Sequence, residues 1–124
     1  MTVLSDSSPL ITLAKIKRLE LLPQLYQTVT ITPEVYAEAV VRGAGLAGAS
    51  QVSEARWINV RPVQEPARLA SAQQRFGLGI GEVSVIILGR ELRADLLLLD
   101  DMKTRTLAKP IAILRPLRRS RAAG

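Results

Sequence analysis

The sequence predicts an α/β domain with a central, mostly parallel sheet and helices on both of its faces. Short runs rich in leucine or β-branched residues alternate with segments whose apolar residues recur at helical spacing. Apolar residues make up 48% of the chain and aromatic residues only 3%, so the core must be built from Leu, Ile, Val and Ala. This mixture suits helices packed on a buried parallel sheet. A chain of 124 residues is long enough for one such domain.

The first predicted elements are a strand and a helix. Residues 2–4 are a candidate for a short buried strand, and Pro9 lies where the first turn of a helix accepts a residue without an N–H. Apolar residues then follow a helical stripe over residues 10–17. The apolar pattern continues to Leu25, with a break expected near Pro23.

The β-branched run at residues 28–31 predicts the second strand. Thr32-Pro33-Glu34 then combines a hydroxyl cap, a proline at the first position and an acid in the first turn, so a helix is expected to about Arg42. The glycine-rich residues 43–48 predict a loop, which a short helical piece and a strand at 57–63 should follow.

The C-terminal half is expected to continue the alternation. Residues 66–75 predict a helix, and the glycines within residues 77–81 predict a turn into a helix over 82–93. Four consecutive leucines at 96–99 are typical of a central parallel strand. The last predicted elements are a helix at 102–108, a strand at 111–114 and a disordered basic tail at 115–124, so that the domain spans residues 1–114.

The chain contains neither histidine nor cysteine, which narrows its chemistry. It cannot supply a Ser-His-Asp triad, a cysteine nucleophile or a His/Cys zinc site. No stretch approaches the roughly 20 apolar residues of a membrane span, and no signal-peptide pattern opens the chain, so we expect a cytoplasmic protein with no membrane partner. The net charge of +6 favours an anionic partner, nucleic acid first.

Five acidic residues lie just after predicted strands or in the first turns of predicted helices. Asp6 follows the first strand, Asp100 and Asp101 follow the leucine run, Glu82 opens the helix before that run, and Glu38 lies one turn into the helix after Pro33. Ligands of open α/β sheets gather beyond the carboxyl ends of the strands, so these acids are expected at one edge. Each acid alone could instead cap a helix or face solvent.

Several carboxylates at one point repel one another unless a cation neutralises them. Oxygen ligands without histidine or cysteine suit Mg²⁺ or Mn²⁺. Such ions can activate water and stabilise the charge of a phosphoryl displacement without a histidine base. A metal site would therefore account for the acids and does not need the histidine that the chain lacks.

These residues resemble the motifs of PIN-domain nucleases. The resemblance rests on residues 5–11 (Ser-Asp-Ser-Ser-Pro-Leu-Ile), residues 79–82 (Gly-Ile-Gly-Glu) and residues 98–101 (Leu-Leu-Asp-Asp), and it covers about residues 2–109. It is strongest to the group with an Asp-Ser-Ser-Pro-Leu-Ile signature, which is similar to VapC-like toxins. It implies a three-layer PIN-like fold and a metal-dependent endoribonuclease that uses Mg²⁺ or Mn²⁺, as the toxin of a toxin–antitoxin pair.

The resemblance also implies roles for single residues and partners. The implied catalytic acids are Asp6, Glu38, Glu82 and Asp100. The implied metal ligands are Asp6, Glu82, Asp100 and the auxiliary Asp101. Ser7 or Ser8 would orient a ligand or a water. The implied partners are an RNA substrate, a cognate antitoxin and a second copy in a homodimer. Relatives end with a strand, a Gly-Thr-Gly-like turn and a helix, whereas this chain ends in an arginine-rich segment.

Other readings fit the residues less well. A response-regulator receiver needs an acidic pair after the first strand, where this chain has Asp6 followed by serines, and an aspartyl phosphatase would have an acid at Ser8. The glycines at 77, 79 and 81 lack the Lys-Ser/Thr of a P-loop. The remaining alternative is a catalytically degenerate PIN-like binding module, which the unusual C-terminus favours and the presence of all four acids opposes.

Overall fold

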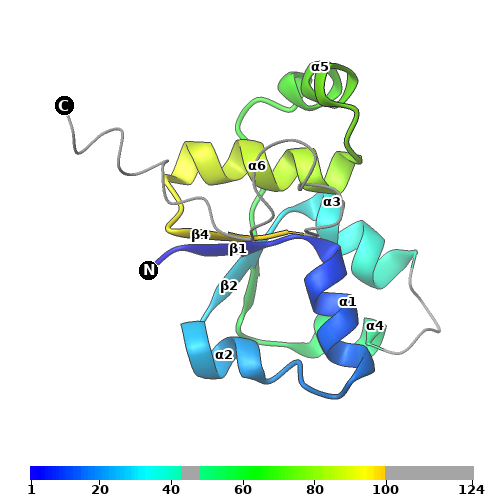
Figure 1. The fold of residues 1–124 in the computed structure, drawn as a ribbon, viewed down its shortest axis with the longest axis vertical. Coiled ribbons are helices and arrows are strands. Elements are labelled where there is room, and N and C mark those ends of the chain that lie inside the picture. The colour runs from blue at the N-terminus through cyan, green and yellow to red at the C-terminus, as the bar shows by residue number, and fades with distance from the viewer. Residues whose placement is uncertain (43–47, 100–124) are drawn as a thin grey trace.

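Four short parallel strands form the sheet at the centre of the molecule (Figure 1). The computed structural model describes residues 1–42 and 48–99. In spatial order the strands are β3 (Ile58–Val60), β2 (Val29–Ile31), β1 (Val3–Ser5) and β4 (Leu96–Leu98). The predicted α/β class is thereby confirmed, and the described part of the sheet is entirely parallel.

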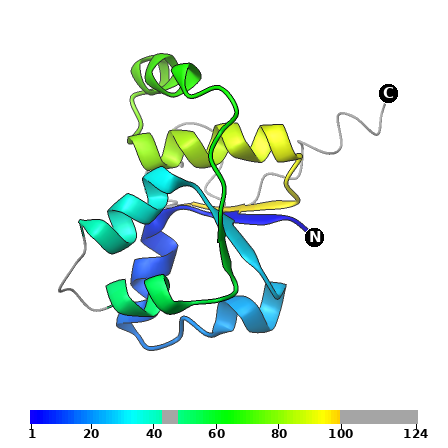
Figure 2. The ribbon, with the colours of Figure 1, turned by 180° about the vertical axis from the view of Figure 1, so that it is seen from behind.

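Helices lie on both sides of this sheet. The helices are α1 (Ser7–Lys15), α2 (Leu21–Tyr26), α3 (Pro33–Tyr36), the π-helix η1 (Ala37–Val41), α4 (Ala49–Glu54), α5 (Ala67–Phe76) and α6 (Ile80–Leu92). One side is covered by α6, with α5 outside it, while α1, α2 and α4 lie on the other side in both views (Figures 1 and 2). This is the predicted three-layer arrangement. None of the helices in the described residues is long and apolar enough to cross a membrane.

The strand register brings three segments to one edge of the sheet. Ser5 is paired with Leu98, and Leu4 with Thr30. Because all these strands are parallel, their carboxyl ends lie at the same edge, and the residues that follow them also start there. Asp6 follows β1, Thr32 follows β2, and Leu99 follows β4.

Aliphatic side chains build the core, as the composition predicts. The largest side chains with essentially no exposed surface include Leu4, Leu10, Ile31, Leu88 and Leu97. No aromatic side chain of the described residues is fully buried, and Phe76 is about half exposed. Burying an aliphatic side chain of this size contributes about 1.5–3 kcal/mol, so the leucine-rich layers supply much of the driving force for folding.

Helix α6 approaches β4 closely because its last turns contain a glycine. A Cβ atom on Gly89 would lie 2.8 Å from Cδ2 of Leu97, closer than non-bonded carbons tolerate. The missing side chain lets the helix rest directly on the strand. The position of α6, and of its N-terminus at the carboxyl edge, is therefore set by contact with the strand beside β1.

Several element boundaries differ from the prediction. The first helix begins at Ser7, which puts Pro9 in its first turn as predicted, but the break in the helical pattern falls at residues 16–20 rather than near Pro23. Pro23 is the third residue of α2, where the N–H has no partner within the helix, so proline costs little there. The strand expected at 57–63 is shorter and forms β3. The elements predicted after Leu99 lie outside the described residues.

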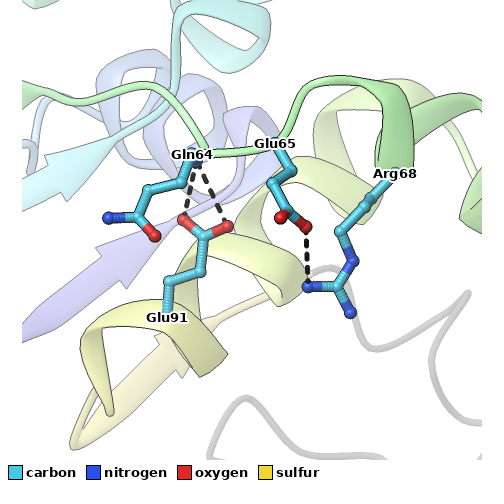
Figure 3. A network of polar contacts seen from close by, with 4 residues as sticks. All are labelled: Gln64, Glu65, Arg68 and Glu91. Atoms are coloured by element: carbon cyan, nitrogen blue, oxygen red, sulfur yellow. Dashed lines mark hydrogen bonds and ion pairs between the residues drawn. The ribbon is translucent and has the colours of Figure 1, made fainter.

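The segment between β3 and α5 is tied to α6 by a backbone contact (Figure 3). The backbone N–H of Gln64 donates to both carboxylate oxygens of Glu91, at 2.9 and 3.2 Å. Nearby, Arg68 and Glu65 form an ion pair of 3.6 Å with both side chains mostly exposed, so it adds little stability. The Glu91 contact holds α5 and its connection over the outer side of α6.

Candidate functional site

Asp6 lies at the carboxyl end of β1 and is almost fully buried, with 3% of its surface exposed. Its backbone N–H donates to the carbonyl of Leu98 at 2.9 Å, which continues the β1–β4 pairing by one residue. Asp6 occupies the N-cap position of α1, but its side chain makes no capping hydrogen bond. The Asp6 side chain is therefore not the cap of α1.

Ser7 connects the first acid to the second. Its hydroxyl donates to Oε1 of Glu38 at 2.9 Å, across the gap between α1 and η1. The resemblance implies that Ser7 or Ser8 orients a ligand or a water, and the described contact of Ser7 is its bond to the Glu38 carboxylate. Since Ser7 directly follows Asp6, this hydrogen bond brings the segment that carries Glu38 beside the end of β1.

Glu38 lies in the π-helix η1, which continues α3. The backbone N–H of Arg42 bonds to the carbonyl of Ala37 at 2.8 Å, a bond between residues five apart. The π-helical turn therefore begins just before Glu38, whereas Glu34 lies in the preceding α-helical turn. Single turns of π-helix are frequent at functional sites.

The N-terminal turn of α6 lies against the Glu38 carboxylate. A Cβ atom on Gly81 would lie 2.8 Å from both Cδ and Oε2 of Glu38 and would overlap with Oε1. Only a glycine leaves room for the carboxylate at this point. The next residue, Glu82, is in the first turn of α6, where the helix dipole favours a negative charge, and it is 4% exposed.

Two hydroxyl groups form a link between the segment that leads into Glu38 and helix α6, which carries Glu82. No sequence pattern indicated that these two groups would meet. Thr32, predicted as a helix cap, accepts from the backbone N–H of Val35 at 3.1 Å, which confirms that prediction. Its Oγ1 also lies 2.6 Å from Oγ of Ser84 in α6. The only sequence signal for Ser84 is a serine inside the apolar run Val83–Ile87.

Asp100 and Asp101 lie outside the described residues, so their predicted places in the site are not tested. Among residues 1–42 and 48–99, no three acidic side chains form a group that could hold a metal ion. A site of three or more carboxylates would thus need a ligand from beyond this part of the chain. Asp100 directly follows Leu99, the residue after β4.

The donor atoms at this edge suit a hard cation. They are carboxylate and hydroxyl oxygens, and two of the carboxylates, on Asp6 and Glu82, are almost completely buried. Burial penalises a charged carboxylate, and a bound cation offsets that penalty. Oxygen donors of this kind fit Mg²⁺ or Mn²⁺.

An apolar groove elsewhere on the molecule offers no such donors. It lies between α5 and α6 and is lined by Ala72, Phe76, Leu78, Val83, Ile86 and Ile87. With no acid or hydroxyl among these side chains, the groove can bind an apolar group but not a cation.

A comparison with protein families finds one match that spans most of the chain. The model of the DUF3368 family, which is a PIN domain, matches residues 2–114. This range includes all four strands and every acid described above. Neither the curated proteins nor the solved structures contain a match to the chain.

Proposed function

Since this chain belongs to the PIN-domain family, whose members are generally nucleases, we propose that it is a metal-dependent endoribonuclease. The observation that carries the proposal is the joining of three acid-bearing segments at one sheet edge. Ser7, beside Asp6, bonds to Glu38, and the Glu38 carboxylate rests on Gly81, beside Glu82.

The proposed ligands are Asp6, Glu82 and Asp100, with Asp101 as an auxiliary acid and Glu38 as the fourth acid of the site. Asp100 is included because it follows Leu99 at the end of β4, the strand paired with β1. A bound Mg²⁺ or Mn²⁺ would activate the attacking water and offset the charge that develops on the phosphate. Hydrolysis would leave a 5′-phosphate and a 3′-hydroxyl.

The side chains of this chain have separate tasks in the proposal. Asp6 and Glu82 are both buried, so bulk water does not reach their carboxylates. The lower dielectric constant around them would strengthen their attraction for a cation. Ser7 donates to one oxygen of Glu38 and so restricts the orientation of that carboxylate. Gly81, which has no side chain, leaves the space that this carboxylate occupies.

The proposed substrate is RNA, and basic residues would supply much of its affinity. Seven of the 17 lysines and arginines follow Asp101 in the sequence, Lys103 and Arg105 among them. Contacts between such residues and phosphates are independent of sequence and weaken as salt rises. We further propose that the chain is the cytoplasmic toxin of a toxin–antitoxin pair, forms a homodimer, and is held inactive by a cognate antitoxin.

The decisive experiment is cleavage of a mixed RNA pool by the purified chain with Mn²⁺. Asp6→Asn keeps the shape of the side chain and removes its charge, so cleavage should fall to background, as it should with excess chelator. Glu20→Gln removes an exposed carboxylate outside the site and is the matched control. The proposal fails if Asp6→Asn cleaves as fast as the parent chain, because the activity would then come from a contaminant.

A binding module without catalysis is the second candidate, and the apolar groove between α5 and α6 favours it. Such a module would bind a partner through that groove and need no intact acid site. The same experiment separates the two functions. Metal binding without cleavage of any RNA, at any concentration of clean protein, would support the binding module.

A further inference from the structure

Two buried hydroxyl groups connect the helices that carry Glu38 and Glu82. Thr32 is the N-cap of α3, the helix that leads into Glu38, and Ser84 lies two residues after Glu82 in α6. Both residues have no exposed surface. Their oxygens are 2.6 Å apart, a short hydrogen bond between residues 52 positions apart in sequence.

The direction of this hydrogen bond follows from the other bonds that the two hydroxyls make. Ser84 donates its proton to the carbonyl of Gly81 at 2.7 Å. Its single proton is then used, so Thr32 must be the donor in the contact with Ser84. Thr32 in turn accepts from the backbone N–H of Val35. All three hydrogen bonds therefore point the same way: Val35 donates to Thr32, Thr32 donates to Ser84, and Ser84 donates to Gly81.

This chain of bonds ends on the residue against which Glu38 rests. The carbonyl of Gly81 is held by Ser84, while its Cα faces the Glu38 carboxylate. At the other end of the series, Thr32 caps α3, the helix that leads into η1 and Glu38. The two hydroxyls thus tie the carrier of one acid to the carrier of the other.

We propose that Thr32 and Ser84 are positioning residues that set the placement of the Glu38 carboxylate relative to Glu82. The inference rests on the proposed function, since it assigns these hydroxyls to a metal-dependent acid site. Serine is a poorer helix former than alanine because it competes for backbone hydrogen bonds. A serine at a fully buried helical position is best explained by the bond that it makes to another element.

The first test measures the position of Glu38 without any metal. In the parent chain, Glu38→Gln should shift the amide resonance of Gly81, because the carboxylate lies against that residue. In a Ser84→Ala background, the same substitution should shift Gly81 far less, since the carboxylate has moved. An equal shift in both backgrounds would overturn the inference. Should Ser84→Ala fail to fold, Ser84→Cys keeps the volume with a weaker donor and is read in the same way.

Two control variants separate positioning from stability. Thr32→Ser keeps the hydroxyl that caps α3 and donates to Ser84, so the Gly81 response should match the parent. Val85→Ala removes packing from the next residue of α6, also fully buried, but no hydroxyl. It should lower the melting temperature and leave the Gly81 response unchanged. A response lost equally in Val85→Ala would mean that Ser84 acts only through stability.

The second test measures Mn²⁺ binding by calorimetry. Ser84→Ala should weaken binding about tenfold, the lower end for loss of a contact just outside the metal ligands themselves. If Ser84→Ala binds Mn²⁺ as tightly as the parent chain, the two hydroxyls do not position the metal site. If the parent chain itself binds no Mn²⁺, the proposed function fails, and the Gly81 resonance still decides whether the hydroxyls place Glu38.

Discussion

The hydroxyl of Ser7 donates to the carboxylate of Glu38, joining the residue after the first acid to the second acid 31 positions later. Ser7 is 8% exposed and Glu38 is half-buried, so water competes only partly for this bond. The contact crosses from the first turn of α1 to the π-helix η1. It makes the geometry of the site depend on a side chain that is not itself acidic.

We expect Ser7→Ala to release Glu38, the acid beside the proposed metal ligands, and to lower Mn²⁺ affinity about tenfold, as loss of a contact just outside the metal ligands typically does. The free energy of unfolding should fall by about 1 kcal/mol, the usual net contribution of a hydrogen bond. Ser8→Ala is the matched control, because the half-buried Ser8 has the same side chain one residue further on. Calorimetry and urea unfolding measure both quantities. Equal effects of the two substitutions would contradict the role given to Ser7.

Gly81→Ala should damage the site although alanine is the better helix former. The added Cβ would meet the Glu38 carboxylate, and either that side chain or α6 has to move. Alanine would otherwise stabilise a helix interior by about 1 kcal/mol relative to glycine. Because the obstructing atoms are the end of a flexible side chain, we expect Glu38 to give way, so Mn²⁺ binding should weaken without a loss of stability. Unchanged Mn²⁺ binding would contradict the role given to Gly81.

The control for this substitution is Gly79→Ala. A Cβ on Gly79 has no atom within 4 Å, so the same methyl group enters open space. Gly79 is the N-cap of α6, and alanine there costs at most about 1 kcal/mol in cap preference. We expect its Mn²⁺ affinity to equal that of the parent chain. Weaker Mn²⁺ binding by Gly79→Ala would indicate that any change at this turn disturbs the site.

Local rules were sufficient to predict where Asp6 and Glu82 lie. A carboxylate directly after a parallel strand, or in the first turn of a helix, is placed by the backbone of its own element. For the same reason, the strands and the longer helices were predicted to within a few residues of their observed ends. The error at Pro23 arose because proline marks a helix start as readily as a helix break.

The surroundings of Glu38 could not be predicted in this way. Its placement depends on a π-helical turn, which no short sequence pattern specifies, and on contacts with α1 and α6. Ser84 was missed for a similar reason, since its partner Thr32 belongs to another element. Contacts between distant segments are determined by packing, so they cannot be predicted from local patterns in a single sequence.

Metal binding should stabilise the folded chain through the buried acids. A ligand that binds only the folded state, present at about 100 times its Kd, stabilises that state by about 2.7 kcal/mol. The melting temperature of the parent chain should therefore rise by several degrees with Mn²⁺ and return to its starting value with chelator. Asp6→Asn should lose this response, whereas Glu54→Gln, on the exposed side of α4, should keep it. An equal response from all three proteins would indicate metal binding outside the proposed site.

Cleavage of RNA should weaken as salt rises, because phosphate contacts release bound counterions. This prediction can be tested on three arginines that lie close together in the sequence near the C-terminus, Arg118, Arg119 and Arg121. Replacing all three with glutamine should raise KM for RNA, leave kcat unchanged, and flatten the dependence of log(kcat/KM) on log salt.

The matched control replaces three exposed basic residues at the end of α1, Lys15, Lys17 and Arg18, with glutamine and so removes the same charge. If RNA is attracted by net charge alone, both triple variants should change KM and the salt dependence equally. A larger effect from the C-terminal arginines would show that they contact the RNA backbone. No effect from either variant would mean that RNA affinity comes from other basic residues, and that the excess of positive charge serves another purpose.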